Sequence, residues 1–156
     1  MEPEDKNTSK LSVHRVLAHS YTMYFVLFLI GVTLDLIFRL KIFRTSIMVP
    51  TGFFFLVLAT VIILWAQKTG RDLRKVKEIK TEHFCRGPYC YTRSPTHWGL
   101  FFMMLGFGIM ANAVFVILST LISFIIAKFV FLDKEETILE KKYGAPYLEY
   151  KKLVKY

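Results

Sequence analysis

Residues 98–132 read WGLFFMMLGFGIMANAVFVILSTLISFIIAKFVFL and carry one charged side chain, Lys128. A run of this composition belongs in a bilayer, but it is too long for one ordinary span of about 20 residues. Small residues interrupt the run near its middle, at Gly106, Gly108 and Ala111, Asn112 and Ala113. We therefore predict two spans, 98–110 and 114–132, joined as a tight helical hairpin whose first arm is short.

Two further apolar runs precede the hairpin. Residues 21–38 contain one charge, Asp35, and residues 47–66 contain none. Each run is long enough for a membrane helix. Pro50 falls in the first turn of the second run, where its missing N–H costs little. The pattern predicts an all-α integral membrane protein of about four transmembrane helices, with a C-terminal helical hairpin and a polar loop and tail.

The composition of the whole chain agrees with a membrane protein. The 156 residues are 54% hydrophobic and carry a formal net charge of +9. The cations flank the apolar runs, a pattern that favours anionic lipid headgroups over nucleic acid as the cause of the charge. Lys and Arg are concentrated in residues 67–97 and 133–156, which predicts a multi-pass protein of the cell inner or plasma membrane with this loop and tail in the cytoplasm.

The length fits a single domain, which we divide into five segments. They are a frayed tail and short interfacial helix (1–20), two spans (21–66), a loop that opens with a basic amphipathic stretch (67–97), the hairpin (98–132) and a tail (133–156). The helix that leaves the last span is expected to stop at Gly144 and Pro146.

Asp35 is a carboxylate inside a predicted span, and such a residue is a functional candidate. Arg39 follows four residues later, which is the spacing of an ion pair along a helix. We therefore expect Asp35 to form a structural pair with Arg39.

The two cysteines, Cys85 and Cys90, lie in the central loop. On a cytoplasmic face they are expected to be reduced thiols. Their C-x4-C spacing is not usual for zinc, and only His83 and His97 are nearby. We predict no metal site.

The predicted hairpin brings two polar segments together. Its entry reads GPYCYTRSPTHWG at residues 87–99, and its exit continues into Glu135 and Glu136. The two ends of a helical hairpin are neighbours, so these segments must meet. Taken singly, each has an ordinary explanation: aromatics and arginine anchor at membrane interfaces, glycines pack helices, and paired glutamates are solvated. Together they predict a polar site at the mouth of the hairpin.

The order G-P-Y-x-Y-x-R-x-P-x-x-x-G, then an apolar hairpin, then E-E-x-x-L-x-x-x-Y-G-x-x-Y-x-x-Y resembles the isoprenylcysteine carboxyl methyltransferase and phospholipid methyltransferase family. Members of that family are integral membrane enzymes that use S-adenosylmethionine. The resemblance covers residues 87–155. It implies methyl transfer to a membrane lipid or an isoprenoid-linked small molecule, on a carboxylate or on an amine.

The resemblance also implies a set of cofactor-binding residues. They are Gly87, Pro88, Tyr89, Arg93, Pro95, His97, Gly106, Gly108, Glu135, Glu136, Tyr143 and Tyr147. The chemistry suits this cofactor, because a carboxylate binds its ammonium, an arginine binds its carboxylate, and aromatic faces attract its sulfonium. Glycines let the backbone approach a ligand closely. The candidate catalytic residues are His97, Glu136 and Arg93, since an amine acceptor must lose a proton to a base.

The chain departs from the family pattern at three places. The usual R-H-P is Arg93-Ser94-Pro95, the tyrosine that usually follows is His97, and a terminal R-V-P-R is absent. His97 is positioned to supply the missing imidazole, and Lys151 and Lys152 to replace the missing arginines. Two alternatives stay open: an NADPH-dependent membrane reductase with a similar C-terminal segment, and a non-catalytic scaffold of the same fold.

Overall fold

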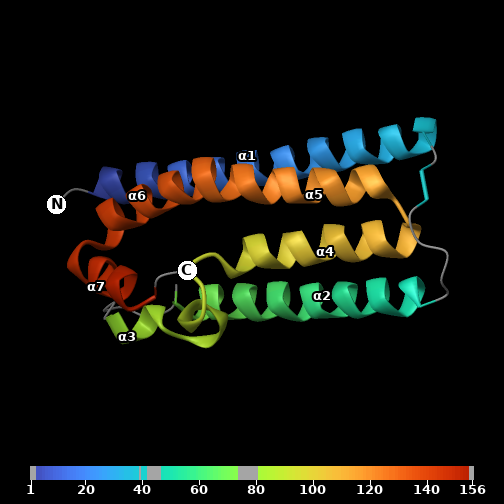
Figure 1. Cartoon of the computed structure of the whole chain (residues 1–156). Helices are drawn as coiled ribbons and strands as arrows, with labels where there is room; N and C mark the ends of the chain where they lie inside the picture. Colours follow the sequence, from blue (N-terminus) through green and yellow to red (C-terminus); the bar gives the residue numbers. More distant parts are fainter. Residues whose placement is uncertain (1–2, 39, 42–46, 74–80, 155–156) are drawn as a thin grey trace.

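The computed structural model describes residues 3–38, 40–41, 47–73 and 81–154, and each regular element in them is helical (Figure 1). In chain order the elements are α1 (Pro3–Phe38), α2 (Met48–Leu73), α3 (Thr81–Phe84), the 3-10 turn η1 (Gly87–Cys90), α4 (Pro95–Ala111), α5 (Val114–Ile126), the π-helical segment η2 (Ala127–Phe131), α6 (Leu132–Tyr143) and α7 (Ala145–Leu153). The predicted all-α class is confirmed.

Three stretches are long and apolar enough to cross a bilayer. They are Ala18–Phe38, Met48–Leu73 and Val114–Tyr143, the last formed by α5, η2 and α6 in one continuous helix. α4 is also apolar but has 17 residues. Its length of about 26 Å falls slightly short of a hydrocarbon core of about 30 Å. The short first arm of the predicted hairpin is therefore confirmed.

The hairpin turns at Asn112 and Ala113. Asn112 has φ of +52°, in the left-handed region that asparagine tolerates better than most residues. The N–H of Ala113 donates to the Gly108 carbonyl at 2.8 Å, which closes the end of α4. The turn lies where the small residues predicted it.

α1 is longer than we predicted. The frayed tail expected over residues 1–10 and the separate interfacial helix expected over 11–20 are wrong for residues 3–20, because one helix runs from Pro3 into the span. Proline is tolerated in a first helical turn, and no further glycine or proline occurs before Gly31. Nothing in this stretch breaks the helix.

Asp35 caps a neighbouring helix. Its carboxylate accepts hydrogen bonds from the backbone N–H groups of Phe115 at 3.2 Å and Val116 at 2.9 Å, at the start of α5. The first N–H groups of a helix have no partner within the helix and form the positive end of its dipole. The expected partner Arg39 lies outside the described residues. The role of Asp35 is structural, as expected, but its partner here is α5.

The helices pack in the order α1, α5, α4, α2 (Figure 1). α2 and α4 approach closely because two glycines face each other. A Cβ atom added at Gly52 would lie 2.6 Å from the Gly106 carbonyl oxygen, and one added at Gly106 would lie 2.8 Å from the Gly52 carbonyl oxygen. This contact brings α2 against the hairpin.

One end of the bundle is polar. α3, η1 and α7 gather there, while the α4–α5 turn lies at the opposite end (Figure 1). α2 continues past the predicted end of its span at Ala66 to Leu73, so the start of the basic stretch 68–80 is a helical extension. Residues 74–80 lie outside the described residues. The predicted site lies at this polar end.

Candidate active site

Arg93 and Glu136 form a buried ion pair at the mouth of the hairpin. Arg93 Nη1 lies 2.8 Å from Glu136 Oε1, and the two side chains are 15% and 6% exposed. Arg93 precedes α4, and Glu136 lies in the first turns of α6. The predicted meeting of the hairpin's entry and exit is therefore confirmed.

His97 and Glu135 make a second contact beside this pair. His97 Nε2 lies 3.3 Å from Glu135 Oε1, and both side chains are largely buried. The ring of Tyr24, on α1, stacks on the imidazole with 6.0 Å between centroids. His97 Nδ1 is buried and has no hydrogen-bond partner among the described residues. Buried polar atoms are normally bonded, so Nδ1 is the atom that a ligand can satisfy.

Lys151 of α7 closes the site from the tail. Its Nζ lies 2.8 Å from Glu136 Oε2 and 2.7 Å from Glu140 Oε1. These contacts with Glu136 and Glu140 raise the pKa of the Lys151 ammonium. Lys151 was considered above as a substitute for the missing arginines, and in this structure it pairs with glutamates. Sequence spacing did not reveal this contact, because a turn at Gly144 separates α6 from α7.

The predicted tyrosines hold the tail against the loop. Tyr147 and Tyr150 are buried with Phe84 of α3, and Tyr143 packs edge-on against Phe84 at 5.1 Å. The Tyr150 hydroxyl donates to the Tyr89 carbonyl at 2.6 Å. Burial raises the pKa of both Tyr147 and Tyr150 above that of a free phenol. These tail tyrosines thus hold the loop that carries Arg93 in position.

The loop before Arg93 is tied down at two points. Gly87 has φ of +57°, and a Cβ atom there would lie 2.7 Å from Thr69 Oγ1 of α2. The expectation that Cys85 and Cys90 are separate thiols is wrong in this structure, because they form a disulfide. The η1 turn brings their Cα atoms to 4.5 Å, within the usual range for such a bond.

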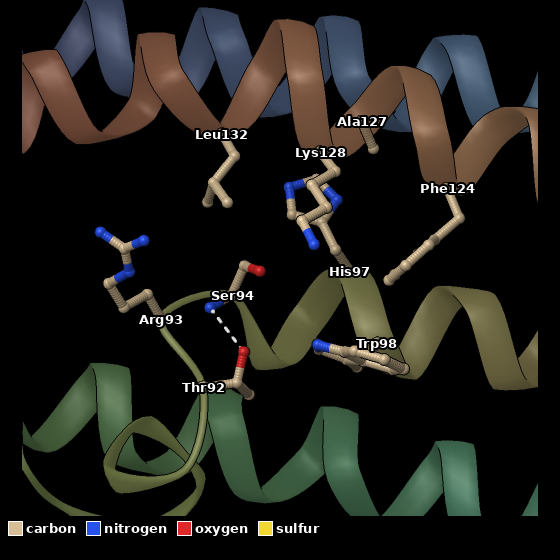
Figure 2. Close-up of a pocket in the computed structure, with 9 residues that line it drawn as sticks. All are labelled: Thr92, Arg93, Ser94, His97, Trp98, Phe124, Ala127, Lys128 and Leu132. Atoms are coloured by element: carbon tan, nitrogen blue, oxygen red, sulfur yellow. Dashed lines mark hydrogen bonds between the residues drawn. The ribbon is translucent and has the colours of Figure 1, made fainter. Parts of the chain in front are cut away.

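A cavity of about 80 Å³ lies between the start of α4 and η2 (Figure 2). Its lining comprises Thr92, Arg93, Ser94, His97, Trp98, Phe124, Ala127, Lys128 and Leu132. η2 is π-helical: the N–H of Leu132 donates to the Ala127 carbonyl five residues earlier. Such turns are frequent at functional sites. No pattern in the sequence indicated this one.

Two predicted site residues lie elsewhere. Gly106 and Gly108 follow His97 along α4 by nine and eleven residues, which places them about 14 Å or more away along the helix axis. Gly106 packs against α2, and a Cβ atom at Gly108 would lie 2.9 Å from the Ile117 side chain of α5. Both glycines therefore have the surroundings of helix-packing residues. Sequence analysis gave helix packing as the ordinary explanation for them.

Pro88 and Pro95 are buried at the polar end. Pro95 begins α4, where its fixed φ suits the first helical position.

Sequence reasoning missed Tyr24, because an aromatic residue within an apolar span carries no signal of a polar contact.

Comparison with protein families matches residues 21–146 to the family described as phospholipid methyltransferase. The matched region includes the hairpin and the cluster of Arg93, His97, Glu135 and Glu136. No curated protein and no solved structure matches the chain.

Proposed function

The chain belongs to the phospholipid methyltransferase family, and we propose that it methylates the headgroup amine of a membrane phospholipid. Enzymes of this family are S-adenosylmethionine-dependent, and the chain is a multi-pass integral membrane protein. The observation that carries the proposal is the buried Arg93–Glu136 ion pair beside His97. Of the acceptors left open by the sequence, an amine-bearing phospholipid agrees best with the family.

The charges of the site suit the amino-acid portion of S-adenosylmethionine. That cofactor carries an ammonium and a carboxylate, and its sulfonium supplies the methyl group when it is bound. Arg93 suits the carboxylate and Glu136 suits the ammonium. The two side chains now pair with each other at 2.8 Å. A zwitterion that exchanges into this pair leaves neither buried charge uncompensated, which avoids the main cost of breaking a buried ion pair.

The other predicted cofactor residues at the polar end support this pair. We assign Gly87, Pro88, Tyr89, Pro95, Tyr143 and Tyr147 to the wall that holds Arg93 and Glu136 in place. The turn at Gly87, the Tyr89–Tyr150 hydrogen bond and the Phe84 aromatic cluster favour this role. Methyl transfer is an in-line displacement, so alignment of the reactants and exclusion of water are the protein's main contributions.

His97 is the proposed base. An ammonium headgroup has no lone pair, so it must lose a proton before its nitrogen can attack the methyl carbon. Glu135 faces His97 Nε2 at 3.3 Å, and Nδ1 has no partner among the described residues. In this arrangement Nε2–H donates to Glu135 and Nδ1 accepts the proton. The Glu135 carboxylate then stabilises the imidazolium that results.

We also infer that the polar end faces the cytoplasm. S-adenosylmethionine is a soluble, charged molecule that must enter from water. Short loops rich in Lys and Arg favour the cytoplasmic side, and such residues are concentrated in segments 67–97 and 133–156. The cofactor and the cationic segments thus favour the same orientation. The Cys85–Cys90 disulfide at this end is unusual for the cytosol and by itself favours the opposite orientation.

The two alternatives from the sequence receive less support. A reductase must bind the phosphates of NADPH, which calls for unpaired cations. Lys151 contacts Glu136 and Glu140, and Arg93 contacts Glu136. Among the described residues of the cavity lining, Lys128 is then a single cation for the three phosphate groups of NADPH. A scaffold would have no need of a buried histidine with an open nitrogen. Measurements of ligand binding and of methyl transfer distinguish both alternatives from the proposal.

Titration of the purified protein in detergent with S-adenosylmethionine and with NADPH tests the cofactor site. We expect S-adenosylmethionine alone to bind, and Glu136→Gln to weaken binding roughly tenfold or more, because a charge-assisted contact is lost. Asp133→Asn removes the same charge from an exposed position on the same helix and should leave binding unchanged. Wild-type affinity in Glu136→Gln would exclude this glutamate from the site.

Transfer of a labelled methyl group to phosphatidylethanolamine vesicles tests the reaction. We expect His97→Gln to lower kcat by about 10²-fold or more, as for loss of a general base, with unchanged affinity for S-adenosylmethionine. If His97→Gln labels phospholipid as fast as the wild type does, the histidine has no part in the mechanism. Cofactor binding without any transfer would favour the scaffold.

A further inference from the structure

A second, larger cavity of about 430 Å³ adjoins His97 through Tyr24. Its lining is apolar except for tyrosine hydroxyls and comprises Tyr21, Tyr24, Phe25, Phe28, Leu56, Leu100, Met103, Met104 and Phe107. We propose that this cavity, the apolar groove, binds one acyl chain of the acceptor phospholipid and so delivers its headgroup to His97. The inference rests on the proposed function and assigns the site of its lipid substrate.

The groove follows from how the helices pack. α1 lies along α5, and α2 lies along α4 (Figure 1). Residues of α1, α2 and α4 meet at the groove. The lining comes from these three helices, all apolar, and two of them are long enough to cross a bilayer. The groove therefore opens within the hydrocarbon layer, where lipid chains surround it.

The size of the groove fits a chain. Its volume of about 430 Å³ falls within the range of about 300–1,000 Å³ that small-molecule sites occupy. Along α4 the lining runs from Leu100 to Phe107, which corresponds to about 10 Å of helix. A segment of an acyl chain lying along α4 fills such a space.

Two buried hydroxyl groups lie near the end of the groove closest to the polar end, and of these Tyr24 belongs to the lining. Tyr24 is 3% exposed and Ser20, one turn earlier on α1, is 0% exposed. Neither Tyr24 OH nor Ser20 Oγ has a hydrogen-bond partner among the described residues. Buried hydroxyls are costly without partners. The ester carbonyls of a phospholipid, which lie between its chains and its headgroup, are acceptors for the Tyr24 hydroxyl.

The orientation of the lipid then follows. The Tyr24 ring stacks on His97 at 6.0 Å, so ester groups at Tyr24 place the headgroup beside the imidazole. The chain extends from there past Met103 toward Phe107, away from the polar end. A phospholipid in the leaflet on the side of the polar end already points its headgroup toward that end. It can enter sideways without turning over.

Cross-linking with a phosphatidylethanolamine that carries a photoreactive diazirine on one acyl chain tests the groove without turnover. We expect labelling of Phe28, Met103 and Phe107 in vesicles, and suppression of this labelling by excess unlabelled phosphatidylethanolamine but not by phosphatidylglycerol. Phe53 and Phe54, which are exposed on α2, serve as controls for bulk lipid. Equal labelling of groove and control positions, unaffected by either competitor, would overturn the proposal.

Filling the groove tests its part in the reaction. Met103→Trp should raise KM for long-chain phosphatidylethanolamine by roughly tenfold, the effect of losing about two buried methylenes. Affinity for S-adenosylmethionine should not change. Leu118→Trp adds the same bulk on the exposed surface of α5 and should keep the wild-type KM. The same KM in both variants would overturn the proposal.

Tyr24→Phe isolates the hydroxyl, because it keeps the ring that stacks on His97. We expect a higher KM for the lipid, with kcat and affinity for S-adenosylmethionine unchanged; a wild-type KM would exclude the ester contact. The two proposals fail separately. A wild type that transfers no methyl group contradicts the proposed function, while competed cross-links at the groove would still establish a lipid site.

Discussion

Glu136 is the side chain on which most polar contacts of the site converge. It is 4% exposed and lies between Arg93 and Lys151, each 2.8 Å from one of its oxygens. A buried carboxylate is destabilising unless cations or donors compensate it. Arg93 is itself buried, whereas Lys151 is partly exposed and screened by solvent, so Arg93 is the stronger partner. Each residue of the pair therefore depends on the other for its place in the interior.

Tyr150 should make stability depend on pH in the alkaline range. Burial, followed by the neighbouring Tyr89 phenol, raises the pKa of Tyr150 above its ordinary value of about 10. The unfolded chain therefore releases this proton at a lower pH than the folded chain does. Above about pH 10 the unfolded state gains from this release, so the free energy of unfolding falls as pH rises.

Comparison of Tyr150→Phe with the wild type by thermal unfolding in detergent checks this. Near neutral pH we expect the variant to be less stable by about 1 kcal/mol, since the bond to the Tyr89 carbonyl is lost. The difference should shrink as pH rises beyond about 10, because phenylalanine has no proton to retain. A constant difference up to about pH 11 would contradict the raised pKa of Tyr150.

At the scale of elements, the last long helix is not a uniform rod. Between α5 and α6 the π-helical segment η2 forms part of the cavity beside His97, and Lys128 lies within it. A π-turn holds one more residue than an α-turn, so it shifts which side chains of α6 face α4. Glu135 and Glu136 lie in the first turns of α6, four and five residues after η2 ends, and both face the start of α4.

The contact between α2 and α4 gives a prediction at the same scale. Gly106→Ala would place a Cβ atom 2.8 Å from the Gly52 carbonyl oxygen and should destabilise the protein by roughly 1–3 kcal/mol, because two backbones must move apart. A Cβ atom at Gly70, on α2, would meet only the Tyr89 hydroxyl at 3.8 Å, so Gly70→Ala serves as the control. This control should be neutral or stabilising by up to about 1 kcal/mol, the helix preference of alanine.

Thermal unfolding measures both glycine variants, and cofactor titration of the folded Gly106→Ala protein tests the role implied by family resemblance. The packing environment predicts unchanged affinity for S-adenosylmethionine. A loss of affinity with unchanged stability would instead support Gly106 as a cofactor-binding residue.

At the scale of the whole molecule, the bundle has a polar end, which carries the site, and an opposite end. α3, η1 and α7 lie at the first, and the end of α1 lies at the second (Figure 1). With the polar end in the cytoplasm, Leu40 faces the opposite side of the membrane from Lys152. Both residues are exposed, which makes them suitable for labelling.

Cysteine labelling in intact cells tests this orientation. In a Cys85→Ser/Cys90→Ser background, Leu40→Cys should react with a membrane-impermeant maleimide added outside, and Lys152→Cys should react only after permeabilisation. The physical reason is the cationic loop and tail together with a soluble cofactor. The reverse pattern would contradict the proposed topology.

Sequence patterns were sufficient for the spans, the hairpin and the meeting of Arg93 with Glu136. Their common cause is the bilayer, which forces each apolar run into a helix because lipid cannot satisfy backbone hydrogen bonds. Once residues 98–132 form two helices with a turn near Asn112, the polar segments at their outer ends must meet. The polar character of the site at the mouth of the hairpin followed from the residue types that flank the hairpin.

Only the tertiary structure decided which side of each helix faces which neighbour. Asp35 caps α5, Tyr24 stacks on His97, and Lys151 reaches Glu136 from beyond the turn at Gly144. These contacts depend on helix rotation and on how closely backbones approach, and both are set by packing between helices. Hydropathy carries little of that information, because in a bilayer a buried face and a lipid-facing one are both apolar.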